Sequence, residues 1–291
     1  MVIQRILRLA GFYRIPQRIL TLQVVSAASK FHKRWRQKCL LSAPALSLAL
    51  FGSSKSNDSK ESITTKKVLL AKADALFESG EYQKIYDLLI KYRDNKDVEI
   101  LWRLSRALFN HSKSASDVEA KRMVYEGYDI MEDALKIDNN HWAVHKWMAV
   151  LSDTKNEYEG IKARIKNLLT CKEHMMKAIE LNPNDATTLY MLGNWCFSVA
   201  DMPWYQRKIA SAIFGTVPSS SYEEALQYFE TAEKIDPLFY SHNLLFLGKT
   251  YLKLQRKDEA MKYLKMTAEF PARNDEDHRA KLEATKILGT L

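Results

Sequence analysis

Cysteine, histidine and paired acidic residues are the side chains in this sequence whose chemistry could serve catalysis or metal binding. The three cysteines, Cys39, Cys171 and Cys196, are an odd number and lie far apart, without a C-x-x-C pair. This arrangement argues against a disulfide framework and against a zinc site. Cys171 and Cys196 also fall at packing positions of a helical repeat pattern, where a small apolar thiol is the expected occupant.

The histidines offer one pair with helical spacing. His141 and His145 are four residues apart, so on a helix the two imidazoles would share one face, as in a two-histidine metal site. No third ligand is evident near them, and Trp142 and Trp147 stand beside them. We therefore expect these histidines to pack on or between helices.

Motifs that mark common active sites are missing from the sequence. It contains no Gly-rich phosphate loop, no nucleophile elbow and no H-E-x-x-H motif. The acidic pair Glu223–Glu224 stands near a predicted helix start, where negative charge complements the helix dipole. We therefore expect a protein that is not an enzyme, needs no cofactor or metal, and works by binding partners.

The composition favours helices and places the excess positive charge in one segment. Only 9 of the 291 residues are Gly and 7 are Pro, too few for the many turns of a β-sandwich or barrel. The formal net charge is +9, but residues 1–57 hold ten Lys or Arg and no Asp or Glu. Residues 58–291 therefore hold 34 of the 44 basic residues and all 35 acidic ones. The charge of this larger part is balanced, and no nucleic acid is expected as its partner.

Residues 1–57 have the composition of a mitochondrial targeting segment, because they are rich in Arg, contain Ser and lack acidic residues. Apolar residues also recur there on one helical face, as in a helix that meets an import receptor or an anionic membrane surface: Ile3, Ile6, Leu7 and Ala10. Two alternatives stay open, namely a disordered basic tail and a tail that docks on an acidic polymer such as tubulin or RNA.

Two shorter stretches complete the N-terminal part of the sequence. The apolar run at 39–51 has 13 residues and is interrupted by Ser42, Pro44 and Ser47. A helix needs about 20 apolar residues to cross a bilayer, so no transmembrane span is expected here. Residues 58–65 are polar and are expected to form a flexible linker to the domain at 66–291.

Residues 66–291 repeat the tetratricopeptide pattern, in which helical hairpins stack along a solenoid. Small residues at two positions of this pattern let the two helices of a hairpin approach closely. The best match places apolar or small residues at all the characteristic positions: Leu244, Leu247, Gly248, Tyr251, Ala260 and Leu264. Four more degenerate hairpins precede it, and a final helix near 275–288 would cap the open end. We predict an all-α, tetratricopeptide-like helical-repeat solenoid, with an irregular helical bundle as the alternative.

The fourth hairpin contains an insertion. Gly193 and Ala225 occupy the two small positions of this hairpin but stand 32 residues apart, so about 20 residues are inserted if both helices belong to one hairpin. Pro203 is suited to start a helix within 201–220. That helix would either fill the groove and buttress a repeat, or line a pocket for a partner helix or an acyl chain. The partner-binding residues expected here are Trp204, Tyr205, Arg207 and Lys208.

A basic stripe forms the second candidate surface. Lys162 and Lys166 are four residues apart, with Arg164 between them, on the long helix predicted to start near Tyr158. The stripe is either a solvated helix face or a contact for an acidic partner such as a tubulin tail.

Six stretches of the sequence resemble the regulator of microtubule dynamics family. The resemblance runs from about residue 66 to the end: ESGEYQKIYDLLIKY (78–92), LWRLSRA (101–107), YEGIKARIKN (158–167), KAIELNPNDAT (177–187), MPWYQRKIA (202–210) and NLLFLGKTYLKL (243–254). The third and fifth stretches are specific, whereas LGKTYLKL alone is generic repeat sequence. The resemblance implies a helical-repeat fold, binding to microtubules and tubulin, and a role at the spindle in attaching and segregating chromosomes. It also implies localisation in the cytoplasm and at spindle poles, and links to mitochondria.

Three hypotheses for function follow. The first is a non-catalytic scaffold that binds microtubules. The second is a mitochondrial scaffold for a protein partner, with residues 1–57 as its address. The third is a lipid-binding module whose pocket is lined by the insertion. A cleaved targeting segment would place the body inside mitochondria and away from microtubules, so the first two hypotheses differ in location.

Overall fold

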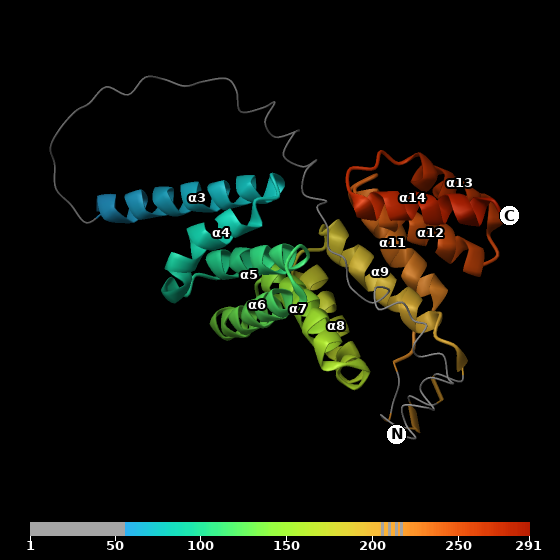
Figure 1. Cartoon of the computed structure of the whole chain (residues 1–291), viewed down its shortest axis with the longest axis horizontal. Helices are drawn as coiled ribbons and strands as arrows, with labels where there is room; N and C mark the ends of the chain where they lie inside the picture. Colours follow the sequence, from blue (N-terminus) through green and yellow to red (C-terminus); the bar gives the residue numbers. More distant parts are fainter. Residues whose placement is uncertain (1–55, 205–206, 209–210, 213–214, 216–217) are drawn as a thin grey trace. The chain divides into compact units, whose positions relative to one another are not determined.

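The computed structural model describes residues 56–204, 207–208, 211–212, 215 and 218–291, and among these residues it contains helices and no strand (Figure 1). Two compact units are distinguished, one that ends at Asn139 and one that spans Asn140–Leu291. The helices of the first unit are α3 (Ser56–Glu78), α4 (Tyr82–Leu89), the 3-10 helix η2 (Ile90–Asn95), α5 (Val98–Ser112) and α6 (Asp117–Ile137). Those of the second are α7 (Trp142–Glu159), α8 (Ile161–Leu181), α9 (Ala186–Ala200), α11 (Tyr222–Ile235), α12 (Ser241–Lys253), α13 (Lys257–Glu269) and α14 (Asp275–Leu288).

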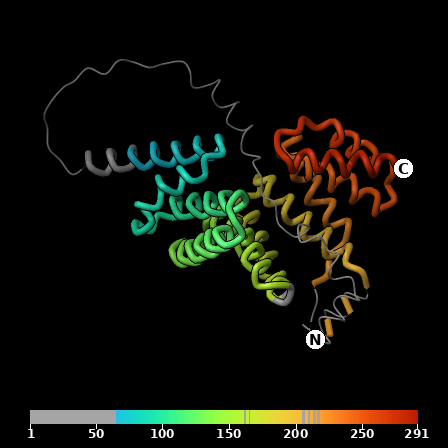
Figure 2. Tube along the Cα trace, viewed as in Figure 1, coloured from blue at the N-terminus to red at the C-terminus, as the bar shows by residue number. Residues whose placement is uncertain are grey.

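Side-chain caps mark the start of five helices, α5, α6, α9, α11 and α14. Each of these residues accepts a hydrogen bond from a backbone N–H in the first turn of its helix: Asp97, Ser116, Asp185, Ser221 and Asn274. Such a cap satisfies one of the four N–H groups that a helix leaves unpaired at its beginning. The short turns between helices, followed along the tube in Figure 2, are therefore fixed by local sequence.

Small residues bring the paired helices together, as the repeat pattern predicts. A Cβ atom added at Gly193 in α9 would lie 2.6 Å from the Phe229 ring of α11, and one added at Gly248 in α12 would lie 2.7 Å from Leu264 of α13. Neither position has room for a larger side chain. The alanines at the matching positions of the second helices, Ala225 and Ala260, are fully buried. The predicted tetratricopeptide-like fold is confirmed.

The contact between Gly193 and Phe229 also shows that α9 and α11 form one hairpin, although residues 201–220 separate them. Residues 204, 207, 208, 211 and 212 of this insertion are helical. The predicted inserted helix of the fourth hairpin is therefore present.

The first unit contains two hairpins, α3 with α4 and α5 with α6. Ser105 Oγ in α5 donates a hydrogen bond of 3.0 Å to the Gly127 carbonyl in α6, which joins the two small positions of this hairpin. The turn after α3 passes through Gly80, whose φ of 75° is in the left-handed region that favours glycine. Helix α3 begins at Ser56, so residues 58–65 are helical and do not form the expected linker. A polar stretch of Ser, Asp, Lys and Glu has the composition of a linker and of a solvated helix alike.

The last helix covers the end of the second unit. Leu245 of α12 and Leu264 of α13 pack with Ala280 and Ala284 of α14 in one buried cluster. Helix α14 is thus the predicted terminal helix, and it shields apolar side chains that a further hairpin would otherwise cover. Within the described part of the chain, no helix has the length and apolar character that crossing a membrane requires. The apolar run at 39–51 and the rest of the predicted targeting segment lie outside the described residues.

Candidate functional site

The two described cysteines are packing residues. Cys171 and Cys196 are both buried, and burial raises the pKa of each thiol to about 12. A thiol with so high a pKa holds almost no thiolate at neutral pH, and the thiolate is the nucleophilic and metal-binding form. Cys39 lies outside the described residues. Among the described residues, no three His, Cys, Asp or Glu side chains are grouped to hold a metal ion.

In the structure, the ring of His145 contacts His174, whereas the sequence spacing had suggested a pair with His141. His145 of α7 faces His174 of α8, with 2.9 Å between their Nδ1 atoms and the rings tilted by 43°. In an N–H···N hydrogen bond between two imidazoles one ring donates and the other accepts, and the tautomers decide which ring does which. Burial and then the neighbouring His145 lower the pKa of His174 to about 4, so the His174 imidazole is neutral at pH 7.

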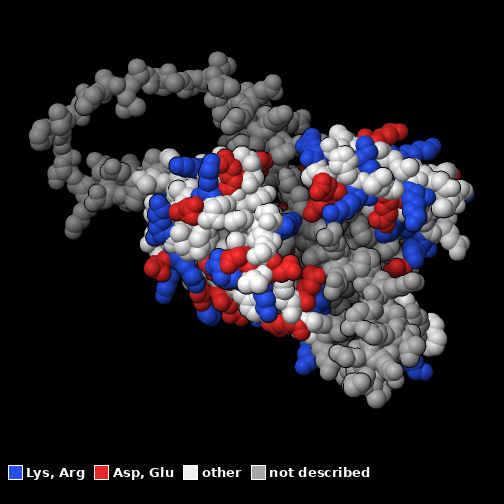
Figure 3. All heavy atoms as spheres, viewed as in Figure 1, with Lys and Arg blue, Asp and Glu red and all other residues white. Residues whose placement is uncertain are grey.

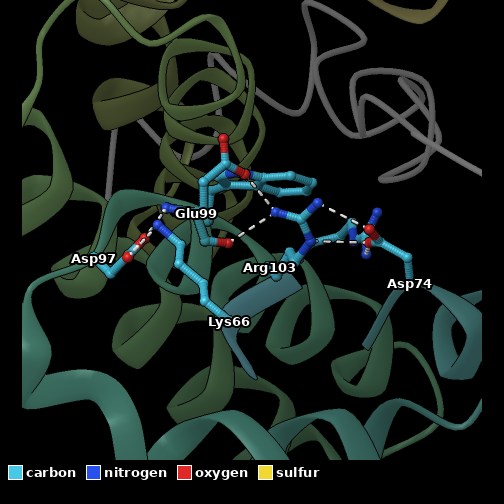
Figure 4. A network of polar contacts seen from close by, with 7 residues as sticks. Lys66, Asp74, Asp97, Glu99 and Arg103 are labelled. Carbon is cyan, nitrogen blue, oxygen red and sulfur yellow. Dashed lines mark hydrogen bonds and ion pairs between the residues drawn. The ribbon is translucent and has the colours of Figure 1, made fainter. Parts of the chain in front are cut away.

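A network of charged side chains joins α3 to α5 in the first unit (Figure 4). Asp74 of α3 accepts hydrogen bonds from Arg103 at 2.8 and 3.0 Å and from Arg106 at 2.7 Å. Arg103 also donates to the carbonyl and the carboxylate of Glu99, one turn earlier in α5. Next to this group, Lys66 of α3 pairs with Asp97 at the start of α5.

Aromatic rings complete this network. The Arg106 guanidinium lies 3.8 Å from the centroid of Phe77 and 4.9 Å from that of Trp102. Desolvation lowers the pKa of Arg106. Burial would raise the carboxyl pKa of Asp74, but the hydrogen bonds and charge of Arg103, and then those of Arg106, hold it below its usual value. The two arginines are balanced by Asp74 and Glu99, so this network holds two helices together and leaves no excess charge for an anion.

The basic stripe is only partly available to a partner. Arg164 turns toward α7, where its Nη2 atom lies 3.4 Å from both carboxylate oxygens of Asp153. Lys166 is exposed and has no ion pair among the described residues. The side chain of Lys162 lies outside the described residues. The stripe therefore presents Lys166 to solvent, while Arg164 serves the packing of the hairpin.

The candidate residues of the insertion also divide into exposed side chains and one that contacts the fold. Trp204 is 75% exposed and Lys208 is also exposed. Arg207 points back toward α9, where it donates to main-chain carbonyls at the end of that helix. Tyr205 lies outside the described residues. The indole of Trp204 and the ammonium group of Lys208, four residues later, are thus both exposed to solvent.

The two ends of the insertion are joined to each other through the carboxylate of Asp201. Asp201 at its start accepts a hydrogen bond of 2.7 Å from the hydroxyl of Tyr222, which follows its end. Lys253 of α12 pairs with the same carboxylate at 2.5 Å, and this hydrogen bond raises the pKa of Lys253. This stem could not be predicted from the sequence, because the three residues come from three separate elements.

A hollow of about 480 Å³ lies on the exposed face of α8. It is lined by residues at helical spacing along one stripe: Leu169, Lys172, Glu173, Met176, Lys177 and Glu180. None of them belongs to the insertion. Sequence reasoning missed this feature, although the seven-residue spacing of the exposed Leu169 and Met176 is visible in the sequence.

The charges elsewhere are mixed. On the face shown in Figure 3, basic and acidic side chains of the described residues are interspersed. Elsewhere in the described residues, ion pairs join different helices, such as Lys249 with Glu283 and Lys172 with Glu224. A large basic surface is thus not seen among the described residues of this face, where an acidic partner would meet only individual lysines and arginines.

Comparison with known proteins identifies relatives over most of the chain. The family described as "Regulator of microtubule dynamics protein 1-3" matches residues 69–291. The chain is 49% identical over 225 residues to "Regulator of microtubule dynamics protein 1" of Mus musculus, which covers 77% of this chain and 74% of that protein. It is 34% identical over 228 residues to "Regulator of microtubule dynamics protein 3" of Xenopus laevis, with 76% of this chain and 49% of that protein covered.

Among solved structures, the chain is similar to TTC0263, described as a thermophilic TPR protein of Thermus thermophilus. The TM-score is 0.52 and the sequence identity 14%, over 76% of this chain and 98% of the other. At this identity the likeness concerns the fold alone, and it agrees with the helical hairpins described above.

Proposed function

Because this chain belongs to the regulator of microtubule dynamics protein 1-3 family, we propose that it is a non-catalytic helical-repeat scaffold that binds microtubules. Family membership over residues 69–291 is the observation that carries the proposal. Two features agree with it. The described cysteines and the His145–His174 pair are held in forms suited to packing, and the fold is one that presents side chains to protein partners.

The contact surface that we propose consists of Trp204 and Lys208 of the insertion together with Lys166 of α8. All three are exposed in the structure. Tryptophan combines a large apolar area with few rotatable bonds, and it is enriched among residues that dominate binding energies. The lysines would meet acidic side chains of tubulin, and this attraction weakens as salt screens it. Tyr205 and Lys162 remain proposed contacts of the same surface.

Co-sedimentation of the full chain with microtubules tests this surface. A double variant, Lys166→Glu with Lys208→Glu, should lower the affinity by about tenfold or more, because it turns two attractive charges into repulsive ones. The matched control is Lys262→Glu with Lys265→Glu, which makes the same charge change at exposed positions of α13. The control should bind like the wild type. An equal loss in both variants would show that only net charge matters and would refute the proposed surface.

On this basis we propose that the protein acts at the spindle and spindle poles and in the cytoplasm, and contributes to chromosome segregation. Imaging of the full chain with a C-terminal fluorescent tag in dividing cells tests the location. Signal along spindle microtubules is the expected result. Exclusion of the signal from the spindle would contradict it.

A mitochondrial scaffold is the second candidate, and the composition of residues 1–57 favours it. Protease protection on isolated mitochondria separates the two candidates. If the full chain is protected and a chain starting at Asp58 is not, residues 1–57 act as an import signal. If neither is protected, the import hypothesis is wrong and the cytoplasmic scaffold stands.

A further inference from the structure

The end of α9 leaves main-chain carbonyls that the helix itself cannot satisfy. The last four C=O groups of an α-helix have no partner within the helix, and they carry the negative end of its dipole. Here backbone N–H groups that follow the helix reach only some of them, with Asp201 donating to Phe197 and Met202 to Val199. The insertion supplies a donor to the Ala200 carbonyl and a second donor to the Val199 carbonyl.

Arg207 provides those donors from within the insertion. Its Nε atom donates to the Met202 carbonyl at 3.0 Å, and its Nη2 atom donates to the carbonyls of Ala200, at 3.0 Å, and Val199. The planar guanidinium carries five N–H donors in a fixed fork, so one side chain can hold three carbonyls at once. A lysine cannot reproduce this arrangement.

The C-terminal end of α9 also stabilises the positive charge of Arg207. The nearest carboxylate in sequence, Asp201, is occupied by Tyr222 and Lys253. The guanidinium therefore faces the C-terminal end of α9, where a cation is favoured by the helix dipole. A side chain held in this way is turned toward its own fold and away from a partner.

The contact fixes the turn of the insertion that carries the exposed indole. The backbone N–H of Arg207 donates to the Pro203 carbonyl at 3.1 Å, which closes the helical turn that includes Trp204. Lys208 follows directly. Anchoring Arg207 to α9 thus fixes the positions of Trp204 and Lys208 on the second unit. It also lowers the conformational entropy cost of ordering these residues when a partner binds.

We infer that Arg207 is a positioning residue, a latch that fixes the insertion to the end of α9 and presents Trp204 and Lys208 to the partner. The latch itself rests on the geometry alone, whereas its effect on binding rests on the proposed function. The residue type is specific, because the rigid fork donates to these carbonyls from two nitrogen atoms, Nε and Nη2, at once.

Hydrogen exchange of the full chain, followed by mass spectrometry, tests the latch without any partner. Arg207→Gln should speed exchange in peptides that cover 201–212 by about tenfold or more, because charge-assisted hydrogen bonds of a folded segment are lost. Arg207→Lys should give an intermediate increase, since it keeps the charge near the helix end but not the fork. Lys208→Gln is the matched control and should leave exchange unchanged. Unchanged exchange in Arg207→Gln would overturn the inference.

Microtubule binding of combined variants then separates positioning from contact. A residue that acts only by presenting Trp204 and Lys208 has nothing left to present once both side chains are replaced, whereas a contact residue still contributes to binding in their absence. We expect Arg207→Gln to weaken binding of the wild type but to cause little further loss in a chain that already carries Trp204→Ala and Lys208→Gln. An equal loss of affinity in both backgrounds would make Arg207 a contact residue and refute the inference. If the wild type binds no microtubules, the proposed function fails, and the exchange result alone decides on the latch.

Discussion

Individual residues show how the fold uses polar side chains that a sequence presents as candidate chemistry. His145 and His141 have the spacing of a metal site, but the partner of His145 is His174, 29 residues later, at 2.9 Å. Arg207 and Lys208 are neighbours in one motif, and one faces a helix end while the other faces solvent. Sequence spacing predicts which residues share a helix face. It does not predict which neighbouring helix end or imidazole that face will meet.

The histidine pair makes stability depend on pH in a calculable direction. The pKa of His174 is about 4 in the fold, and its ordinary value is 6.5. Well above pH 6.5 the imidazole is neutral in both states. As pH falls through 6.5 toward 4, the unfolded chain takes up the proton first, so folding loses about 3 kcal/mol from this residue. The free energy of unfolding, measured by urea denaturation, should therefore be lower at pH 4.5 than at pH 7.

His174→Gln isolates this contribution, because glutamine does not titrate and all carboxylates stay in place. The variant should lose clearly less stability than the wild type between the two pH values. If the wild type and the variant show the same difference, His174 is not held neutral by the fold.

Glycine at the helix contact gives a second prediction at this scale. Gly193→Ala would place a Cβ atom 2.6 Å from the fully buried Phe229 ring. We expect a loss of about 1–3 kcal/mol in the free energy of unfolding, the usual cost of overpacking. Gly289→Ala is the control, since its nearest atoms would be 3.6 Å away. A Gly193→Ala variant as stable as the wild type would contradict the close packing of α9 and α11.

At the scale of elements, the repeat pattern predicted the hairpins because small and apolar residues at fixed spacing are required by helix contact. It predicted less well where the chain departs from the pattern. Residues 58–65 belong to α3, and the turn after α7 is set by Gly160, whose φ of 93° suits only glycine well. The direction of the insertion could not be derived, because it depends on the stem formed by Asp201, Tyr222 and Lys253 from separate elements.

The junction of α3 and α5 depends on one carboxylate. Asp74→Asn should destabilise the first unit by about 2 kcal/mol, because it leaves Arg103 and Arg106 without a charged partner in a partly desolvated site. Chemical denaturation measures this. Asp87→Asn in α4 is the control, since Asp87 is exposed and bonds Gln83 only among the described residues. Equal stability of the two variants would show that the network contributes nothing.

At the scale of the whole molecule, the charge pattern and the family membership carry the functional proposal. The sequence alone shows that the excess positive charge lies in residues 1–57. It also contains the two stretches that are specific to the family, 158–167 and 202–210. It could not tell which of the cations in those stretches are used internally, because burial and ion pairing are properties of the folded chain. Only with the fold do Trp204, Lys208 and Lys166 separate from Arg164 and Arg207.

Saturable binding of the full chain to microtubules is the central property proposed for this protein. The measurement is a co-sedimentation titration at about 50 and about 200 mM salt, where screening lengths differ by about twofold. We expect saturable binding at low salt and clearly weaker binding at high salt, with Trp204→Ala weaker than the wild type in both. Sedimentation no higher than background at low salt would contradict a microtubule-binding scaffold.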